Sequence, residues 1–262
     1  MSKYIAKGAK APLWVSQNFL TSRSVIHSAL SKTTLGKRDH VIEIGPGKGH
    51  ITEKLACRAK RVTAVELDGG LFAKLALRFA GADNVVLIQN DFLRFVLPKS
   101  GGYKVFSSIP FSITTAIVRK LTEAHNPPTE AWLVMEKGAA KRFMGTPRES
   151  LRSLVLKPFF EMEIVFRFSR EDFHPKPACD VVMLQLKRKA RPDIPLGLRP
   201  DFERFVQAAL SGGLYRLLSK KQVSRALKEA GLSNDVVPEE MRYIQWLCLF
   251  RCYARLVLQK PS

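Results

Sequence analysis

Short apolar runs alternate along the first half of the chain with segments whose apolar residues recur at helical spacing. The runs predict strands at Val41–Ile44, Val62–Leu67, Val85–Gln89, Tyr103–Ser107 and Ala131–Met135. The intervening pattern predicts helices at Arg23–Leu30, Ile51–Ala59, Leu71–Phe79, Thr114–Thr122 and Gly138–Met144. Because strands that alternate with helices pair in parallel, we expect an α/β fold with a mainly parallel sheet covered on both faces.

The pattern changes in the second half of the chain. Glu163–Phe168 and Asp180–Leu186 are two more β-rich runs, which predict a hairpin-like end and a seven-stranded sheet. Lys187–Pro200 combines charges with three prolines, which continue neither strand nor helix, so we expect a linker. Helical patterns follow at Phe202–Leu210, Lys221–Ala230 and Arg242–Leu256. The sequence therefore predicts two domains, residues 1–187 and a small all-α domain at residues 188–262.

The charge balance indicates a polyanionic partner. The 262-residue chain has 43 Lys and Arg against 23 Asp and Glu, a formal net charge of +20. A surplus of this size is typical of nucleic-acid-binding proteins and exceeds what solvation of a surface requires. From Lys187 onward, fifteen basic residues stand against seven acidic ones, so the predicted helical domain is itself positive.

The cysteines and the hydropathy indicate the compartment. Cys57, Cys179, Cys248 and Cys252 lack the CxxC spacing and the neighbouring histidines of a zinc site. We expect reduced thiols, no metal and no secretory leader. Every apolar run is shorter than the roughly 18 residues that span a bilayer, so we expect a soluble cytoplasmic protein without a membrane partner.

A glycine-rich turn follows the first predicted strand of the parallel sheet. Its sequence, Glu43-Ile44-Gly45-Pro46-Gly47-Lys48-Gly49, lacks both the G-x-G-x-x-G spacing of dinucleotide sites and the Lys-Ser/Thr pair of a P-loop. It resembles the first motif of class I methyltransferases, where bare backbone lets the methionyl part of S-adenosylmethionine lie against the loop. Gly45 and Gly47 are therefore candidate cofactor-binding residues.

Two carboxylates follow the next strands. Glu66 ends the second strand, where a carboxylate can accept hydrogen bonds from both hydroxyls of a ribose. Asp91 follows the third strand and can accept a hydrogen bond from an adenine amine. Because ligands bind at the carboxyl ends of such strands, this series favours a nucleoside cofactor without phosphates, such as S-adenosylmethionine.

The fourth strand leads into a candidate catalytic tetrad, Ser108-Ile109-Pro110-Phe111. Methylation of an aromatic amine needs acceptors that draw the nitrogen lone pair out of conjugation, together with in-line placement of the methyl group. The Ser108 side chain and a carbonyl beside Pro110 can supply acceptors, and Phe111 can supply a face for an extruded adenine. Alternatively, Phe111 is a core aromatic that follows a turn proline.

These segments together resemble the Erm family, methyltransferases that modify one adenine of 23S rRNA and confer macrolide, lincosamide and streptogramin B resistance. The matching residues are Gln17–Leu20, the Gly45 loop, Glu66, Asn90–Phe92, Ser108–Phe111, Met135–Glu136, Ala140–Phe143 and the tail residues Trp246, Leu249, Phe250 and Tyr253. The motifs through Phe111 are shared with KsgA-type dimethyltransferases of small-subunit rRNA, whereas the tail favours Erm. Ser108 replaces the usual Asn of the tetrad.

The resemblance implies a class I methyltransferase fold, with the catalytic domain at residues 1–187, and S-adenosylmethionine as cofactor. It carries over the cofactor contacts of Asn18, Leu20, Gly45, Glu66, Asp91 and Ser108. The implied partner is 23S rRNA, before or during assembly of the large subunit, bound by a monomer. On the basis of charge alone, the candidate RNA contacts are Lys3, Lys7, Lys10, Lys141, Arg142, Lys187, Arg188 and Lys189.

Three alternatives stay open at this point. The first is a KsgA-type enzyme on small-subunit rRNA, and the second is a catalytically weak, RNA-binding ribosome assembly factor, which the Ser108 replacement favours. The third is a DNA adenine methyltransferase, a class that more often shows a Pro-Pro-aromatic motif and an added recognition domain.

Overall fold

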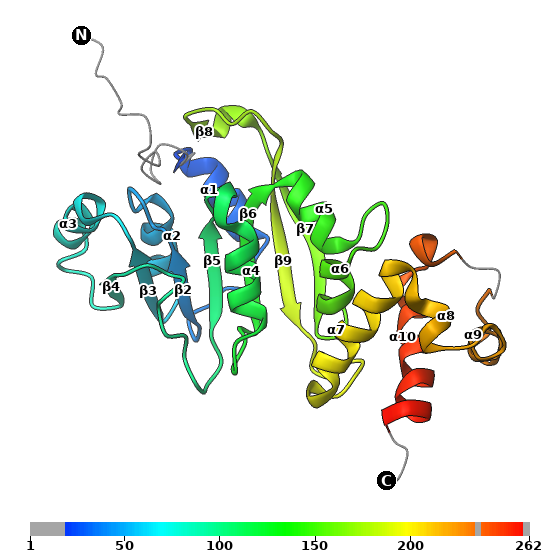
Figure 1. The fold of residues 1–262 in the computed structure, drawn as a ribbon. Coiled ribbons are helices and arrows are strands. Elements are labelled where there is room, and N and C mark those ends of the chain that lie inside the picture. Colours follow the sequence, from blue (N-terminus) through cyan, green and yellow to red (C-terminus); the bar gives the residue numbers. More distant parts are fainter. Residues whose placement is uncertain (1–18, 234–236, 259–262) are drawn as a thin grey trace, which may run out of the picture. The chain divides into compact units, whose positions relative to one another are not determined.

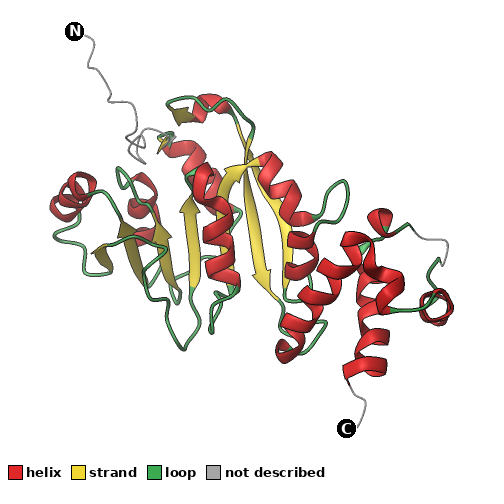
Figure 2. Ribbon diagram, viewed as in Figure 1, coloured by secondary structure: helices red, strands yellow, loops and turns green. Residues whose placement is uncertain are grey.

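The computed structural model describes residues 19–233 and 237–258, and its main sheet has seven strands (Figures 1 and 2). The strand order is β4-β3-β2-β5-β6-β9-β7. The strands are β2 (His40–Ile44), β3 (Arg61–Glu66), β4 (Val85–Gln89), β5 (Lys104–Ser108), β6 (Glu130–Glu136), β7 (Phe160–Phe168) and β9 (Val181–Arg188). A separate pair joins β1 (Phe19–Leu20) to β8 (Phe173–His174).

The predicted parallel sheet is confirmed for the strands from β4 to β6. Neighbours in this part of the sheet all pair in parallel, and Ile42 of β2 lies opposite Thr63 of β3 and Val105 of β5. The side chains of Val41 and Ile42 point to opposite faces because they are successive strand residues, and both are fully buried. Both faces of the sheet are therefore covered, as the continuous apolar runs predict.

The predicted helices are confirmed to within a few residues at their ends. The helices are α1 (Arg23–Ser31), α2 (His50–Arg58), α3 (Gly69–Arg78), α4 (Thr114–Thr122), α5 (Lys137–Met144), α6 (Leu151–Leu156), α7 (Arg199–Ala208), α8 (Leu214–Leu217), α9 (Lys220–Glu229) and α10 (Tyr243–Tyr253). The short helices α6 and α8 were not predicted. In the described ranges, none of the helices has the length and apolar character that a bilayer span needs.

Side-chain caps fix where several helices begin. Ser22 accepts a hydrogen bond from the Val25 amide at the start of α1, and Asp68 accepts one from the Leu71 amide at the start of α3. Each cap satisfies an amide that has no partner within its helix. Because Asp68 caps α3, the helix begins directly after the end of β3, at the edge of the sheet.

The chain forms two compact units. The first consists of residues up to Lys137 together with Ile164–Gln185, and the second consists of Gly138–Glu163 and the residues from Leu186 onward. Strands β7 and β9 each contribute residues to both units. This division differs from the expected boundary at 187/188 because α5, α6 and the start of β7 belong with the C-terminal helices.

The expectation of a linker at Lys187–Pro200 is wrong. Strand β9 continues to Arg188, and α7 begins at Arg199 with Pro200 in its first turn. Between them, the Lys189 amide donates to the Phe159 carbonyl and the Asp193 amide donates to the Pro158 carbonyl. Pro200 fits the first turn of a helix because an amide is not needed there, so a proline does not mark a break in this position.

Aromatic residues form the core of the second unit. Phe250 of α10 packs edge-on against Phe202 of α7, with ring centroids 5.0 Å apart, and Phe205 lies 5.1 Å from Tyr253. Trp246 is fully buried in the same helix. Three of the tail residues that resemble the Erm family, Trp246, Leu249 and Phe250, are thus core residues of the helical unit.

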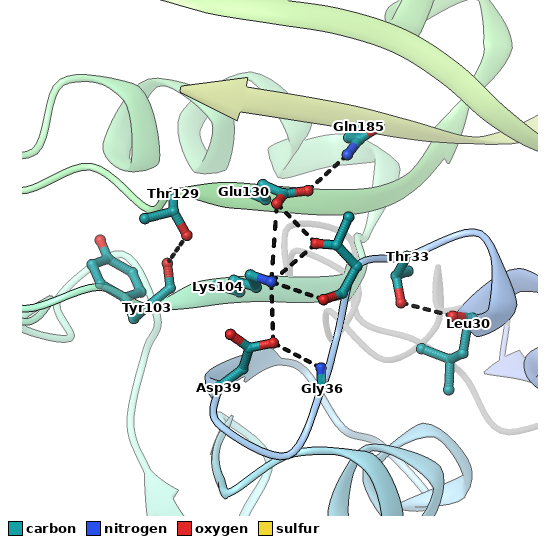
Figure 3. A network of polar contacts seen from close by, with 10 residues as sticks. Leu30, Thr33, Gly36, Asp39, Tyr103, Lys104, Thr129, Glu130 and Gln185 are labelled. Atoms are coloured by element: carbon teal, nitrogen blue, oxygen red, sulfur yellow. Dashed lines mark hydrogen bonds and ion pairs between the residues drawn. The ribbon is translucent and has the colours of Figure 1, made fainter. Parts of the chain in front are cut away.

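A polar network ties the segment before β2 to three strands of the first unit (Figure 3). The Lys104 ammonium of β5 donates to the Thr34 carbonyl at 2.9 Å and lies 3.1 Å from an Asp39 carboxylate oxygen. Glu130 of β6 accepts from the Thr34 hydroxyl and from the amide of Gln185 on β9, both at 2.8 Å. Because this network lies where β5 and β6 begin, it holds the sheet edge opposite the one at which β2 to β5 end.

Candidate active site

Four of the predicted site residues lie at the carboxyl edge of the parallel strands. Gly45 follows β2, Glu66 ends β3, Asp91 lies two residues beyond β4 and Ser108 ends β5. Parallel pairing in register brings these strand ends to one edge of the sheet, which is where ligands bind in open α/β folds.

The loop after β2 depends on its glycines. Gly45, Gly47 and Gly49 have φ angles of 64°, 58° and 79°, in the left-handed region that other residues disfavour. A Cβ atom on Gly47 would lie 2.8 Å from the Phe19 ring, whereas one on Gly45 would meet no heavy atom within 4 Å. Gly47 therefore allows close packing inside the protein, and Gly45 leaves open space beside the backbone.

Glu66 is a buried carboxylate that holds this loop. It is 2% exposed, and its Oε2 atom accepts a hydrogen bond from the Gly47 amide at 3.0 Å. Its Oε1 atom accepts one from the Asp68 amide, also at 3.0 Å. The carboxylate therefore joins the end of β3 to the glycine loop.

A second buried carboxyl group belongs to Glu43, which lies on β2 just before the glycine loop. Burial raises the pKa of Glu43 to about 8, the neighbouring Thr52 hydroxyl opposes the rise, and the Glu66 carboxylate adds to it. Glu43 is 1% exposed, and its Oε2 atom has no hydrogen-bond partner in the described part of the chain. Glu43 is therefore protonated at neutral pH.

Asp91 holds the turn that follows β4. Its Oδ1 atom accepts a hydrogen bond from the Leu93 amide at 2.8 Å, and the side chain is half-buried. The Lys120 ammonium of α4 donates to the Leu93 carbonyl and lies 5.7 Å from the centroid of the Phe92 ring. Burial lowers the pKa of Lys120, and the charge of Asp91 opposes that shift.

The tetrad Ser108–Phe111 is anchored by backbone contacts. The Ile109 amide donates to the Val134 carbonyl of β6 at 3.0 Å, and Ile109 is 3% exposed. The preceding Ser107 is buried and donates its hydroxyl to the Ile44 carbonyl at 2.8 Å. Ser108, Pro110 and Phe111 are half-buried, and the Ser108 hydroxyl has no hydrogen-bond partner among the described residues. The anchored strand end thus presents a free hydroxyl and an aromatic ring.

These residues line one pocket that opens to solvent. The pocket brings together six predicted residues, namely Leu20, Gly45, Ser108, Ile109, Pro110 and Phe111. Gly47, Glu66 and Asp91 lie outside its lining and shape the loops around it. Among the described residues, no three His, Cys, Asp or Glu side chains form a group that could hold a metal ion.

Sequence reasoning missed several residues of the lining. Phe19, Pro46, Lys48, His50, Ile51 and Phe173 also face the pocket. Lys48 lies within the glycine loop and His50 directly follows it, so their positions in the sequence could have suggested them. Phe173 reaches the pocket because β8 pairs antiparallel with β1, where Leu20 lies opposite Phe173. No local pattern predicts this contact between distant residues.

His50 is the one histidine among these additions. Burial lowers the pKa of its imidazole, and the charges of Arg78, Lys48 and Arg23 lower it further, against the opposing effect of Glu53. Its Nδ1 atom is buried and has no hydrogen-bond partner within the described ranges. A neutral imidazole therefore lies beside the pocket at neutral pH.

The predicted RNA contacts fall in two groups. Lys3, Lys7 and Lys10, like the predicted cofactor contact Asn18, lie outside the described residues. The others belong to the second unit, where Lys141, Arg142, Lys187 and Arg188 are exposed. The Lys189 ammonium instead lies 2.6 Å from Asp193 and 5.7 Å from the centroid of the Tyr243 ring. Its charge is therefore already compensated within the protein.

Comparison with known proteins decides the family. The family model for ribosomal RNA adenine dimethylase matches residues 11–255. The chain belongs to the ribosomal RNA adenine dimethylase family. It is 37% identical to an rRNA adenine N-6-methyltransferase of Limosilactobacillus reuteri, over 91% of this chain and 95% of that protein. An Escherichia coli protein of the same name is 33% identical over 91% of this chain and 94% of its own length.

Solved structures of the family share the fold. The 23S rRNA methyltransferase ErmE superposes with a TM-score of 0.81 at 31% identity, over 90% of this chain and 99% of that one. A dimethyladenosine transferase from Plasmodium falciparum superposes with a TM-score of 0.74 at 19% identity, over 90% and 97%. The expected class I methyltransferase fold and the resemblance to the Erm family are confirmed.

Membership makes this chain an rRNA adenine N6-methyltransferase that uses S-adenosylmethionine. The cofactor is an activated methyl donor whose sulfonium carries the transferred group. The open space beside Gly45 suits such a nucleoside, since an added side chain at Gly45 would occupy the space next to the loop. Ser108, which replaces the usual Asn of the tetrad, lines this pocket.

Proposed function

We propose that this protein methylates the exocyclic N6 of one adenine in 23S rRNA, in the cytoplasm, and that this modification confers macrolide, lincosamide and streptogramin B resistance. The observation that carries the proposal is the single pocket formed by the glycine loop and the tetrad Ser108–Phe111. The likeness to the 23S rRNA methyltransferase ErmE supports the large-subunit substrate.

In this proposal the chain's own residues position the two reactants. Gly45 and Leu20 contact the cofactor, Asn18 adds a further contact, and Glu66 and Asp91 serve its ribose and adenine. The Ser108 hydroxyl and the tetrad backbone accept hydrogen bonds from the target amine, which turns its lone pair toward the donor methyl. Phe111 stacks on the extruded base, since an adenine cannot reach the pocket while paired.

The domain roles and the assembly state belong to the same proposal. The catalytic machinery lies within residues 1–187, and residues 188–262 supply the basic C-terminal helices of the second unit. The protein acts as a monomer on free 23S rRNA, before or during assembly of the large subunit. Lys141, Arg142, Lys187 and Arg188 are exposed in the second unit and contact phosphates of this RNA.

Incubation of the full chain with radiolabelled S-adenosylmethionine and separate protein-free 23S and 16S rRNAs tests the substrate. We expect label in 23S rRNA alone, with digestion placing it in N6-methylated adenosine. Label in 16S rRNA would show a KsgA-type substrate instead. Cofactor binding without label in either RNA would show an assembly factor that has lost catalysis, and the equilibrium dialysis that measures this binding is run on the same preparation.

A further inference from the structure

Helix α9 of the second unit presents a continuous basic face. Lys220, Lys221, Arg225 and Lys228, together with Ser224 and Glu229, line one shallow groove along this helix. The four basic residues are exposed, whereas Val223, Ala226 and Leu227 on the opposite side are buried. The helix therefore directs its apolar side to the core of the unit and its basic side to solvent.

Three of these charges are left uncompensated. Arg225 pairs with Glu229 at 2.7 Å, so these two charges cancel. Lys220, Lys221 and Lys228 form no ion pair within the described part of the chain. Four positive charges against one negative charge leave the groove with a net charge of +3.

Helix stability does not explain two of these lysines. Lys220 and Lys221 occupy the first turn of α9, which contains no acidic residue. Cations in this position are disfavoured by the helix dipole, which favours negative charge at the N-terminus. The helix start is already satisfied by a capping box between Ser219 and Gln222. These two lysines therefore oppose the helix dipole and do not stabilise the start of the helix.

An exposed aromatic ring adjoins the basic groove. Tyr215 of α8 is 47% exposed, and the Lys220 ammonium lies 5.7 Å from the centroid of its ring. A flat ring beside a row of cations is the arrangement with which proteins hold single-stranded nucleic acid, because bases stack on the ring while phosphates meet the charges.

We propose that Tyr215 and the basic face of α9 form a docking site for an unpaired segment of the substrate RNA. Phosphates lie along Lys220, Lys221 and Lys228, and one base stacks on Tyr215. An anionic membrane is the other polyanion that a basic helix can meet, but insertion needs a free apolar face. The apolar side of α9 is buried in the protein and cannot insert into a membrane. The exposed positive charges therefore favour RNA as the polyanion.

The inference rests on the proposed function for the identity of the RNA. Binding of the full chain to labelled protein-free rRNA is measured by filter retention at several salt concentrations, with whichever of 23S and 16S rRNA accepts label. The triple variant Lys220→Gln/Lys221→Gln/Lys228→Gln is compared with Lys60→Gln/Lys74→Gln/Lys99→Gln. The control lysines are also exposed and lie on α3 and on the segments that lead into β3 and β5.

The α9 variant should bind RNA at least about tenfold more weakly than the control variant in 0.1 M salt. The slope of log affinity against log salt should fall by about two to three, since roughly one counterion is released per phosphate contact. Tyr215→Ala should weaken binding without changing this slope, because stacking is not ionic. Circular dichroism and cofactor binding, expected to match the wild type, check that the variants are folded.

Two results would overturn the docking site. One is equal RNA affinity of the α9 and control variants, and the other is a loss that appears only with vesicles of anionic phospholipid. A wrong substrate assignment is distinguishable from both, because it moves the label from one rRNA to the other and leaves the comparison of variants intact.

Discussion

At the scale of single residues, two glycines of one loop have different surroundings and different roles. Gly45 and Gly47 share the left-handed backbone conformation, with φ of 64° and 58°. Their surroundings differ, because a Cβ atom at Gly47 would collide with Phe19 and one at Gly45 would meet open space. The same residue type therefore allows internal packing at one position and leaves open space beside the backbone at the other.

The variants Gly45→Ala and Gly47→Ala separate these roles. Both should lose about 1 to 2 kcal/mol of unfolding free energy from backbone strain. Gly47→Ala should lose more, because Phe19 and with it β1 must move. Gly45→Ala should instead weaken binding of S-adenosylmethionine at least tenfold. Urea unfolding and isothermal titration calorimetry measure the two effects, and equal stability of the variants would contradict the packing role of Gly47.

Phe111 tests the stacking role at the same scale. Phe111→Ala should lower kcat about ten- to a hundredfold, since base stacking contributes about 1 to 3 kcal/mol. Cofactor affinity should stay within about twofold. Phe111→Tyr keeps the flat ring and serves as the matched control. Equal loss of turnover and of cofactor affinity in Phe111→Ala would mean that the ring shapes the pocket rather than holding the base.

Glu43 makes stability depend on pH. Its pKa of about 8 in the folded chain lies above the ordinary 4.5, so the folded state keeps a proton that the unfolded chain releases. The free energy of unfolding therefore falls as pH rises from 4.5 to 8 and levels off above that. Relative to Glu43→Gln, the wild type should lose about 2 kcal/mol between pH 6 and pH 8. Urea unfolding at both pH values checks this, and parallel pH profiles would refute it.

At the scale of elements, the two edges of the parallel sheet have separate tasks. The carboxyl edge carries the pocket, and the edge where β5 and β6 begin carries the network around Lys104. The Lys104 side chain is only 14% exposed and lies 3.1 Å from Asp39 and 3.9 Å from Glu130. One cation thus compensates two carboxylates that would otherwise repel each other.

Removal of this cation should therefore destabilise the fold and spare the pocket. Lys104→Met should lower the free energy of unfolding by about 2 to 4 kcal/mol, because two partly buried carboxylates lose their counter-charge. Lys60→Met, a change at an exposed lysine, should cost less than about 0.5 kcal/mol. Thermal unfolding measures both. Weaker cofactor binding by folded Lys104→Met would show that the two edges are coupled.

The sequence predicts elements well where periodicity is strong and poorly where long-range contacts decide. The strand Val85–Gln89 and the helix Thr114–Thr122 were predicted to the residue, because the apolar residues of each segment follow the spacing of that element. The prediction of a linker at Lys187–Pro200 was wrong because a linker and a packed turn before a helix can contain the same prolines and charges. The pocket residue Phe173 could not be predicted, since only the pairing of β1 with β8 brings it to the loop.

At the scale of the whole molecule, the net charge of +20 governs how the protein meets its substrate. Few acidic side chains offset the basic residues, and several of the strongest pairs, such as Lys157 with Glu149, are internal to one unit. A long-range positive field raises the rate of encounter with RNA whatever its sequence. Under the proposed function, selection of one adenine then comes from the pocket and from the shape of the RNA.

A salt series should therefore distinguish charge-driven binding of RNA from binding of the cofactor in the pocket. The affinity of the full chain for rRNA should fall log-linearly with salt, by about a thousandfold between 50 and 200 mM if six or more phosphates are contacted. Affinity for S-adenosylmethionine should change less than about twofold in the same series, because that pocket holds a small ligand without phosphates. Filter retention and equilibrium dialysis measure the two curves on one preparation. A flat RNA curve would mean that charge does not drive binding, and the basic surplus would then need a different partner.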